Sequence, residues 1–197
     1  MIVYFVGKGT GDLNIKSITA NGIIQSEIFV LKDYLYVPKL NGTESIYQIS
    51  GTTTISNGEM SGGSSFLTAG FDNTGDWELT GKVKFSGNNC SFMLIPPTET
   101  SRDNNEMGLS AFTTKTFWYN SGTYGELYNL GRHLSPNIYY DFKIKKENNA
   151  LTTLIDGITR TGFNWFSISS QRLCIGIGGW ASTGNVCTIK EIVIKPL

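Results

Sequence analysis

The stretch "FDNTGDWELTGKVKF", from Phe71 to Phe85, shows the cleanest two-residue alternation in the chain. From residue 77 onward, apolar residues and a glycine alternate with polar ones: Trp77, Leu79, Gly81, Val83 and Phe85 against Glu78, Thr80, Lys82 and Lys84. Because successive side chains of a strand point to opposite faces, this pattern predicts a strand with one face in the core and one in water. Such a strand is typical of an antiparallel sheet whose outer face is solvated.

The rest of the chain has the same character. Of its 197 residues, 40% are apolar and 12% aromatic, only 16% are charged, and 23 are glycines. Few charges favour strands and turns over surface helices, which need Glu, Lys and Arg on their exposed face. Strand-like runs bounded by turn residues recur about every ten residues. So many short strands cannot form one flat sheet, and we expect two packed sheets or a barrel.

The first 45 residues differ from the remainder. Ile28 to Leu31 and Tyr34 to Val37 flank Lys32-Asp33, and Pro38 follows, which predicts a hairpin. A helix is the alternative, because Ile24, Ile28, Leu31 and Leu35 have helical spacing, but the β-branched and aromatic density favours strands. The sequence "NGTES" then interrupts the pattern. We therefore predict an N-terminal β-rich attachment segment over 1–45 and one β domain over 46–197. We expect the start, "MIVYFV", to be a strand and not a signal peptide, because no charged residue precedes the apolar run.

Charge and cysteine content exclude several classes of function. Sixteen basic and sixteen acidic residues give no net charge, so we expect neither nucleic acid nor a membrane as partner. A net charge of zero also favours a protein that is part of a larger assembly. Three cysteines without CxxC spacing and the single His133 argue against zinc. We expect buried thiols, with a Cys174–Cys187 disulfide as the alternative.

Two clusters of oxygen ligands, "FDNTGD" and "SRDNNE", lack the residue order of a calcium loop. Asp and Asn side chains often hydrogen-bond their own backbone in turns, which explains both clusters without a metal. We expect no metal and no cofactor.

Three stretches carry a resemblance to a known superfamily: "TISNGEMSGG" followed by the opening stretch, "YYDFKIKKENNALTTLIDG", and the terminal pair "LCIGIGGW" and "VCTIKEIVIKPL". From about residue 51 onward the order of elements resembles the concanavalin A-like lectin/glucanase (LamG-like) superfamily. The resemblance implies an all-β fold, a two-sheet antiparallel jelly-roll sandwich with one concave face. The Asn- and Gly-rich character and the β-rich N-terminal segment are also similar to modules of bacteriophage tail fibres, baseplates and head decorations. That likeness implies a virion-surface, extracellular location, with virion proteins or further copies of the chain as partners.

A glycoside hydrolase needs two carboxylates placed across the scissile bond. The glucanase branch of the superfamily carries them in a Glu-x-Asp-x-x-Glu run, which this chain lacks. Of its scattered carboxylates, Glu78 and Asp141 lie on predicted strands beside lysines, and we interpret Glu78 as a solvated neighbour of Lys82. No G-x-S-x-G motif surrounds a serine either. We expect no enzyme, and a glycan hydrolase is the least favoured alternative.

Sugar binding without a metal needs aromatic faces and polar side chains. The candidates lie around a predicted irregular loop over 121–137 and after a glycine pair: Trp118, Tyr119, Tyr124, Tyr128, Arg132 and Trp180. Core packing is the alternative for each aromatic residue. Phe29, Tyr34 and Tyr36 are candidates for an assembly interface. The predicted function is a non-enzymatic virion-surface or tail component that binds host-surface carbohydrate. A structural capsid-decoration or head-fibre protein without a ligand is the alternative.

Overall fold

The computed structural model describes residues 14–15, 18–20, 23–25, 29–30, 37–87, 90–98, 106–110, 115–120, 123–129, 134–148, 150–155, 158–164, 171–179 and 184–197. Contacts within the chain separate two compact units, Met1–Tyr34 and Leu35–Leu197. The first unit is β-rich, as predicted. Its strand β1 (Asn14–Ile15) pairs with β4 (Phe29–Val30), and β2 (Ile18–Ala20) pairs with β3 (Ile23–Gln25), both antiparallel.

The strand at Phe29–Val30 pairs with Asn14–Ile15 on the side that precedes it in the chain. The predicted hairpin across Lys32-Asp33 lies outside the described residues. Local alternation identifies a strand but not its partner, which depends on contacts distant in sequence. Tyr34, Tyr36 and the predicted strand at the start of the chain lie outside the described residues, as does the side chain of Phe29.

The division between the units falls earlier than residue 45. Leu40 is 1% exposed and packs in the core of the second unit. Residues 37–45 therefore belong to the second unit and close part of its core.

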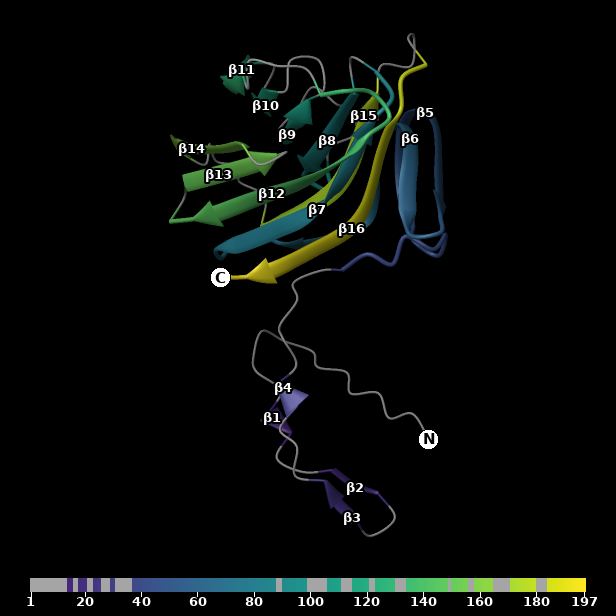
Figure 1. Cartoon of the computed structure of the whole chain (residues 1–197), viewed down its shortest axis with the longest axis vertical. Coiled ribbons are helices and arrows are strands. Elements are labelled where there is room, and N and C mark those ends of the chain that lie inside the picture. Colours follow the sequence, from purple (N-terminus) through teal and green to yellow (C-terminus); the bar gives the residue numbers. More distant parts are fainter. Residues whose placement is uncertain are drawn as a thin grey trace. The chain divides into compact units, whose positions relative to one another are not determined.

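In the second unit, the described residues form a 12-stranded antiparallel sheet without a helix. The strands are β5 (Ile46–Ser56), β6 (Glu59–Asp72), β7 (Trp77–Phe85), β8 (Cys90–Ile95), β9 (Glu106–Ser110), β10 (Lys115–Asn120), β11 (Thr123–Asn129), β12 (Tyr139–Glu147), β13 (Ala150–Ile155), β14 (Ile158–Asn164), β15 (Arg172–Gly179) and β16 (Cys187–Pro196). Their hydrogen-bonded order is β11-β10-β9-β8-β15-β6-β16-β7-β12-β13-β14, with β5 paired to β6 (Figure 1).

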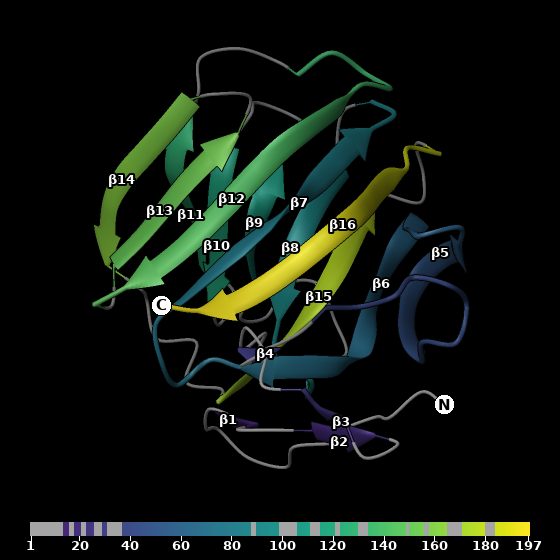
Figure 2. The same ribbon diagram turned by 60° about the horizontal axis from the view of Figure 1, so that its bottom comes forward.

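The sheet folds over on itself at the long strand β6. Residues 59–62 of β6 pair with β16, whereas residues 65–72 pair with β15. Figure 2 shows β16, β7, β12, β13 and β14 as one layer, here called the front layer, with β15, β8, β9, β10 and β11 crossing behind it as the back layer. A Cβ atom on Gly62 would lie 2.6 Å from the Thr53 Cα atom of β5, so a bare backbone is needed where β6 changes partner. The predicted two-sheet jelly-roll sandwich is confirmed.

The core lies between the two layers. The inward set predicted for β7 is buried, with Trp77, Leu79 and Val83 fully inaccessible. The layers meet where the Phe92 ring of β8 lies 4.7 Å, centroid to centroid, from the Phe142 ring of β12. Aromatic pairs at this distance add to the stability that burial supplies.

Three further details complete the sheet. The C-terminal strand β16 is central, between β6 and β7. Strands β13 and β14 pair as far as Ile155 and Ile158, so their connection spans two residues, although residues 156–157 themselves lie outside the described part. The apolar run before Pro96 forms β8 and ends there.

All three cysteines are buried, and none of them forms a disulfide. Cys187 belongs to the core between the layers, whereas Cys174 packs with Phe66 and Ile95 in a separate cluster. The alternative of a Cys174–Cys187 disulfide is therefore wrong, because the two side chains lie in different clusters. Burial raises the pKa of the Cys174 thiol to about 11 and keeps it protonated. Across the described ranges, no helix has the length and apolar character needed to cross a membrane.

Candidate functional site

The turn between β6 and β7 uses its oxygen atoms internally. The backbone N–H and the hydroxyl of Thr74 donate to Asp72 Oδ1 at 2.8 and 2.7 Å. The indole Nε1–H of Trp77 donates to Asn73 Oδ1 at 3.1 Å, and Asp76 accepts from a backbone N–H of the β12–β13 turn. The turn interpretation of "FDNTGD" is confirmed. Within the described residues, no group of three or more His, Cys, Asp or Glu side chains is placed to hold a metal ion.

A buried lysine holds this turn against β12. Lys146 is 4% exposed, and its Nζ donates to the carbonyl oxygens of Asn73 at 2.6 Å and Gly75 at 3.1 Å. Burial lowers the pKa of Lys146, while the charges of Asp76 and Asp72 oppose that effect. Lysines are almost never fully buried unless they are paired, so a lysine in a strand is normally expected to face solvent. The alternation of β12 therefore does not predict that Lys146 contacts this turn.

The solvated face of the front layer carries an ion-pair network. Glu78 lies between Lys143 Nζ at 2.9 Å and Lys195 Nζ at 3.1 Å, and its side chain is 12% exposed. Burial opposes ionisation, but hydrogen bonds and charge from the two lysines outweigh it and lower the pKa of Glu78. The interpretation of Glu78 as a solvated neighbour of Lys82 is wrong, because residues on adjacent strands lie closer than residues four apart along one strand.

A second group lies nearer the start of β12. The Tyr139 hydroxyl donates to Glu59 Oε1 at 2.7 Å, and Lys190 Nζ lies 3.6 Å from the same oxygen. The ammonium groups of Lys84 and Lys190 lie 4.5 and 4.1 Å from the centroid of the Tyr139 ring. The hydrogen bond from Tyr139 is the main cause that lowers the pKa of Glu59. Both groups thus hold their carboxyls ionised.

Between these groups, β16 contains a bulge. Lys190 pairs with Lys82 and Val193 pairs with Thr80, so Glu191 and Ile192 together oppose the single residue Gly81. Glu191 has a φ of 54°, the left-handed conformation of a bulged residue. Ile192 turns into the core, where a Cβ atom on Gly81 would lie 2.5 Å from its Cδ1.

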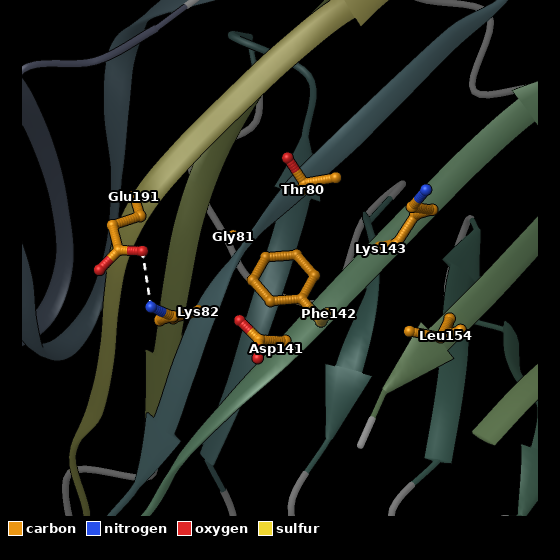
Figure 3. A pocket seen from close by; sticks show the side chains of 8 residues that line it. All are labelled: Thr80, Gly81, Lys82, Asp141, Phe142, Lys143, Leu154 and Glu191. Carbon is orange, nitrogen blue, oxygen red and sulfur yellow. Dashed lines mark ion pairs between the residues drawn. The ribbon is translucent and has the colours of Figure 1, made fainter. Parts of the chain in front are cut away.

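The bulge leaves a hollow of about 280 Å³ on the solvated face of β7, β12 and β16, here called the front hollow. It is lined by Thr80, Gly81, Lys82, Asp141, Phe142, Lys143, Leu154 and Glu191 (Figure 3). Lys82 Nζ lies 2.7 Å from Glu191 Oε2 at its edge. Asp141 is exposed, and no described residue makes a hydrogen bond or an ion pair to its carboxylate.

The front hollow therefore offers two ammonium groups, two carboxylates and one hydroxyl around a floor of bare backbone. The hydrogen bond to Glu191 raises the pKa of Lys82, which stays an ammonium donor at neutral pH. Sequence reasoning missed this site. Its only local signal was Gly81 in an otherwise regular strand, which indicates a close approach of another segment.

The predicted aromatic site lies on the back layer. Trp118 and Tyr119 are in β10, and Tyr124 and Tyr128 are in β11. The register pairs Tyr119 with Tyr124. The side chains of this hairpin, together with Arg132 and Trp180, lie outside the described residues.

The predicted irregular loop over 121–137 is wrong in part, because residues 123–129 form a strand. Its glycine and polar residues suggested a loop, but pairing with β10 overrides local propensity. The structure thus places the four aromatic candidates on two neighbouring strands, whereas the front hollow belongs to the other layer.

No protein-family profile and no curated protein sequence matches this chain. Several solved structures share its fold. The carbohydrate-binding module CBM66 from Bacillus subtilis aligns with a TM-score of 0.56 and 15% identity, covering 78% of this chain and 97% of that one. The cellulose-induced protein Cip1 aligns at 0.54 and 14%, covering 78% and 91%. A lichenase derived from a mouse hindgut metagenome aligns at 0.52 and 13%, covering 74% and 83%.

At these identities the likeness defines the fold. The chain is a jelly-roll sandwich of the architecture found in carbohydrate-binding modules and glycoside hydrolases. These neighbours bear out the jelly-roll fold that the resemblance implied.

Proposed function

We propose that the unit Leu35–Leu197 binds carbohydrate and does not cleave it. The observation that carries this proposal is the match to CBM66, because 97% of that carbohydrate-binding module aligns with this chain. The lichenase shows that the same fold also carries hydrolysis, so the carboxylates of this chain must be considered separately.

Two of the described carboxylates, Glu59 and Glu78, support binding over hydrolysis. A glycosidase acid needs a raised pKa so that it holds a proton at working pH. Glu59 and Glu78 have lowered pKa values instead, and each is held by a cation on a neighbouring strand. Such groups stay ionised and accept hydrogen bonds, which suits the recognition of hydroxyls.

A glycan array probed with the labelled full chain tests the proposal, in parallel with a reducing-sugar assay on every glycan that binds. We expect binding to a restricted set of glycans and no release of reducing ends. Uniformly negative arrays overturn the binding proposal and favour the structural decoration protein. Release of reducing ends that disappears when a carboxylate is replaced overturns the non-enzymatic part.

We further propose that the protein is a virion-surface or tail component, with the Met1–Tyr34 unit as its attachment segment. The separation into two units supports this proposal, because an attachment segment must dock without disturbing the binding domain. An antibody against the Leu35–Leu197 unit should label intact virus particles in electron micrographs. If the antibody labels only cells or secreted material, the virion assignment fails.

A further inference from the structure

We infer that the front hollow binds one neutral, hydroxyl-rich sugar ring. This inference rests on the proposed carbohydrate-binding function and assigns it a position and a ligand class. The position lies on the solvated face of the front layer, where β16 bulges opposite Gly81.

The charges around the front hollow select against an ionic ligand. The two lining ammonium groups are already matched, since Lys82 is paired with Glu191 and Lys143 with Glu78. Because Glu78 also pairs with Lys195 and Asp141 adds a third carboxylate, three positive and three negative charges surround the hollow. An anionic sugar meets the carboxylates, and a cationic sugar meets the ammonium groups, so either pays a repulsion that a neutral ring avoids.

Hydroxyl groups match these side chains in hydrogen-bonding character. A sugar hydroxyl both donates and accepts, whereas an ammonium only donates and a carboxylate only accepts. Lys82 Nζ and Glu191 Oε2 stand 2.7 Å apart, so neighbouring hydroxyls of one ring can bond to both. Asp141 supplies a further acceptor that no described residue occupies, and charge-assisted bonds of this kind are stronger than neutral ones.

The dimensions set the size of the ligand. About 280 Å³ lies at the lower limit of ligand pockets, roughly 300 Å³, which leaves room for a single ring. Leu154 and the aliphatic part of Lys143, on adjacent strands β13 and β12, offer an apolar wall to the C–H face of the ring. The geometry is rigid, because every lining residue belongs to the paired strands of the front layer.

Two-dimensional NMR of the ¹⁵N-labelled full chain tests the inference. The probes are the methyl pyranosides of glucose, galactose, mannose and N-acetylglucosamine, with glucuronate and glucosamine as charged probes. At least one neutral probe should shift the amide signals of residues 80–82, 141–143 and 191 with a dissociation constant of about 1 to 10 mM. The charged probes should bind at least tenfold more weakly.

Two variants locate the contact. Asp141→Ala removes an acceptor, and Thr80→Trp fills the front hollow. Each variant should weaken binding of the neutral probe at least tenfold. Their matched controls are Glu147→Gln, a carboxylate of the same layer paired with Lys145, and Thr152→Trp, a half-buried threonine of β13 outside the hollow. Both controls should bind as the unaltered chain does, and circular dichroism confirms that each variant is folded.

The outcomes separate this inference from the proposed function. Shifts confined to the β10–β11 hairpin, or tighter binding of a charged probe, overturn the front hollow while carbohydrate binding stands. If no probe shifts any signal although the glycan array is positive, the single-ring hollow is again wrong. A negative array together with silent spectra overturns both.

Discussion

Replacing Gly81 with alanine should destabilise the protein, although alanine usually stabilises a strand relative to glycine. The new Cβ atom lies 2.5 Å from Ile192 Cδ1 and 3.0 Å from Phe142 Cε1, inside a core that is closed on both sides. Overpacking of this kind costs about 1 to 3 kcal/mol. Alanine also restricts the unfolded chain more than glycine does, which stabilises the folded state by about 0.4 to 1 kcal/mol. We therefore expect a net loss of about 1 to 2 kcal/mol.

The matched variant Ile192→Val removes the methyl group that the new Cβ atom meets. Alone it should cost about 0.5 to 1.5 kcal/mol. In the Gly81→Ala background, Ile192→Val should lower the free energy of unfolding by less than it does alone, or should raise it. A double-mutant cycle measures this difference as a coupling energy between the two positions. Gly75→Ala is the control, because nothing lies within 4 Å of its added Cβ atom.

Urea unfolding of the full chain followed by tryptophan fluorescence measures these free energies. With a slope of about 2 kcal/mol per molar urea, Gly81→Ala should lower the midpoint by roughly 0.5 to 1 M. A Gly81→Ala variant as stable as the unaltered chain, together with additive effects of Ile192→Val, refutes the packing of the bulge onto Gly81.

Three further predictions follow from contacts on the second unit. Deleting residues 1–34 should leave the melting temperature of this unit unchanged. Deleting residues 1–45 should lower its free energy of unfolding by about 2 to 5 kcal/mol, because buried Leu40 is lost. Equal melting curves for both deletions would contradict a division between the units at residue 34. Lys146→Met should cost about 1 to 3 kcal/mol in urea unfolding, because two turn carbonyls lose their donor, and an unchanged midpoint would show that these bonds contribute nothing. The pKa of Glu78 in the folded state lies below its usual 4.5, so its contribution of about 1 kcal/mol to the free energy of unfolding should be present above pH 4.5 and disappear as the pH falls through the folded-state pKa. The difference in unfolding free energy between the unaltered chain and Glu78→Gln should therefore vanish by about pH 2 to 3. A difference that does not depend on pH would exclude the ion pairs as its cause.

The alternation over Trp77 to Phe85 was sufficient to predict a half-buried strand, because such a strand has only one way to place its apolar side chains. The number of strands left two packed sheets or a barrel, and the jelly-roll sandwich was implied by the resemblance. The same reasoning could not pair the strands. The N-terminal strand at Phe29–Val30 pairs with Asn14–Ile15, and residues 123–129 form a strand that pairs with β10. Pairing depends on contacts distant in sequence, which the period of a strand does not encode.

The site was less accessible to sequence reasoning than the fold. Trp118 and Tyr119 were selected for their residue type, and they do lie on strands of the back layer. The front hollow depends instead on register, since Glu191 and Ile192 share one partner in β7. A bulge of this kind leaves no motif in "CTIKEIVIKPL", because the strand reads as regular until its neighbour is known.

The register also places cations beside two carboxyl groups on this face of the sandwich. On one side of the bulge, Glu78 is held by two lysines, and on the other, Glu59 is held by Tyr139 and Lys190. Both carboxyls have lowered pKa values, so neither retains the proton that a glycosidase acid must donate. At the bulge itself the regular pairing stops, and the acceptor of Asp141 opens to solvent beside bare backbone. Between these two ion-paired groups the front hollow leaves the Asp141 carboxylate open to solvent, which is why we propose that a hydroxylated ligand is bound there and not cleaved.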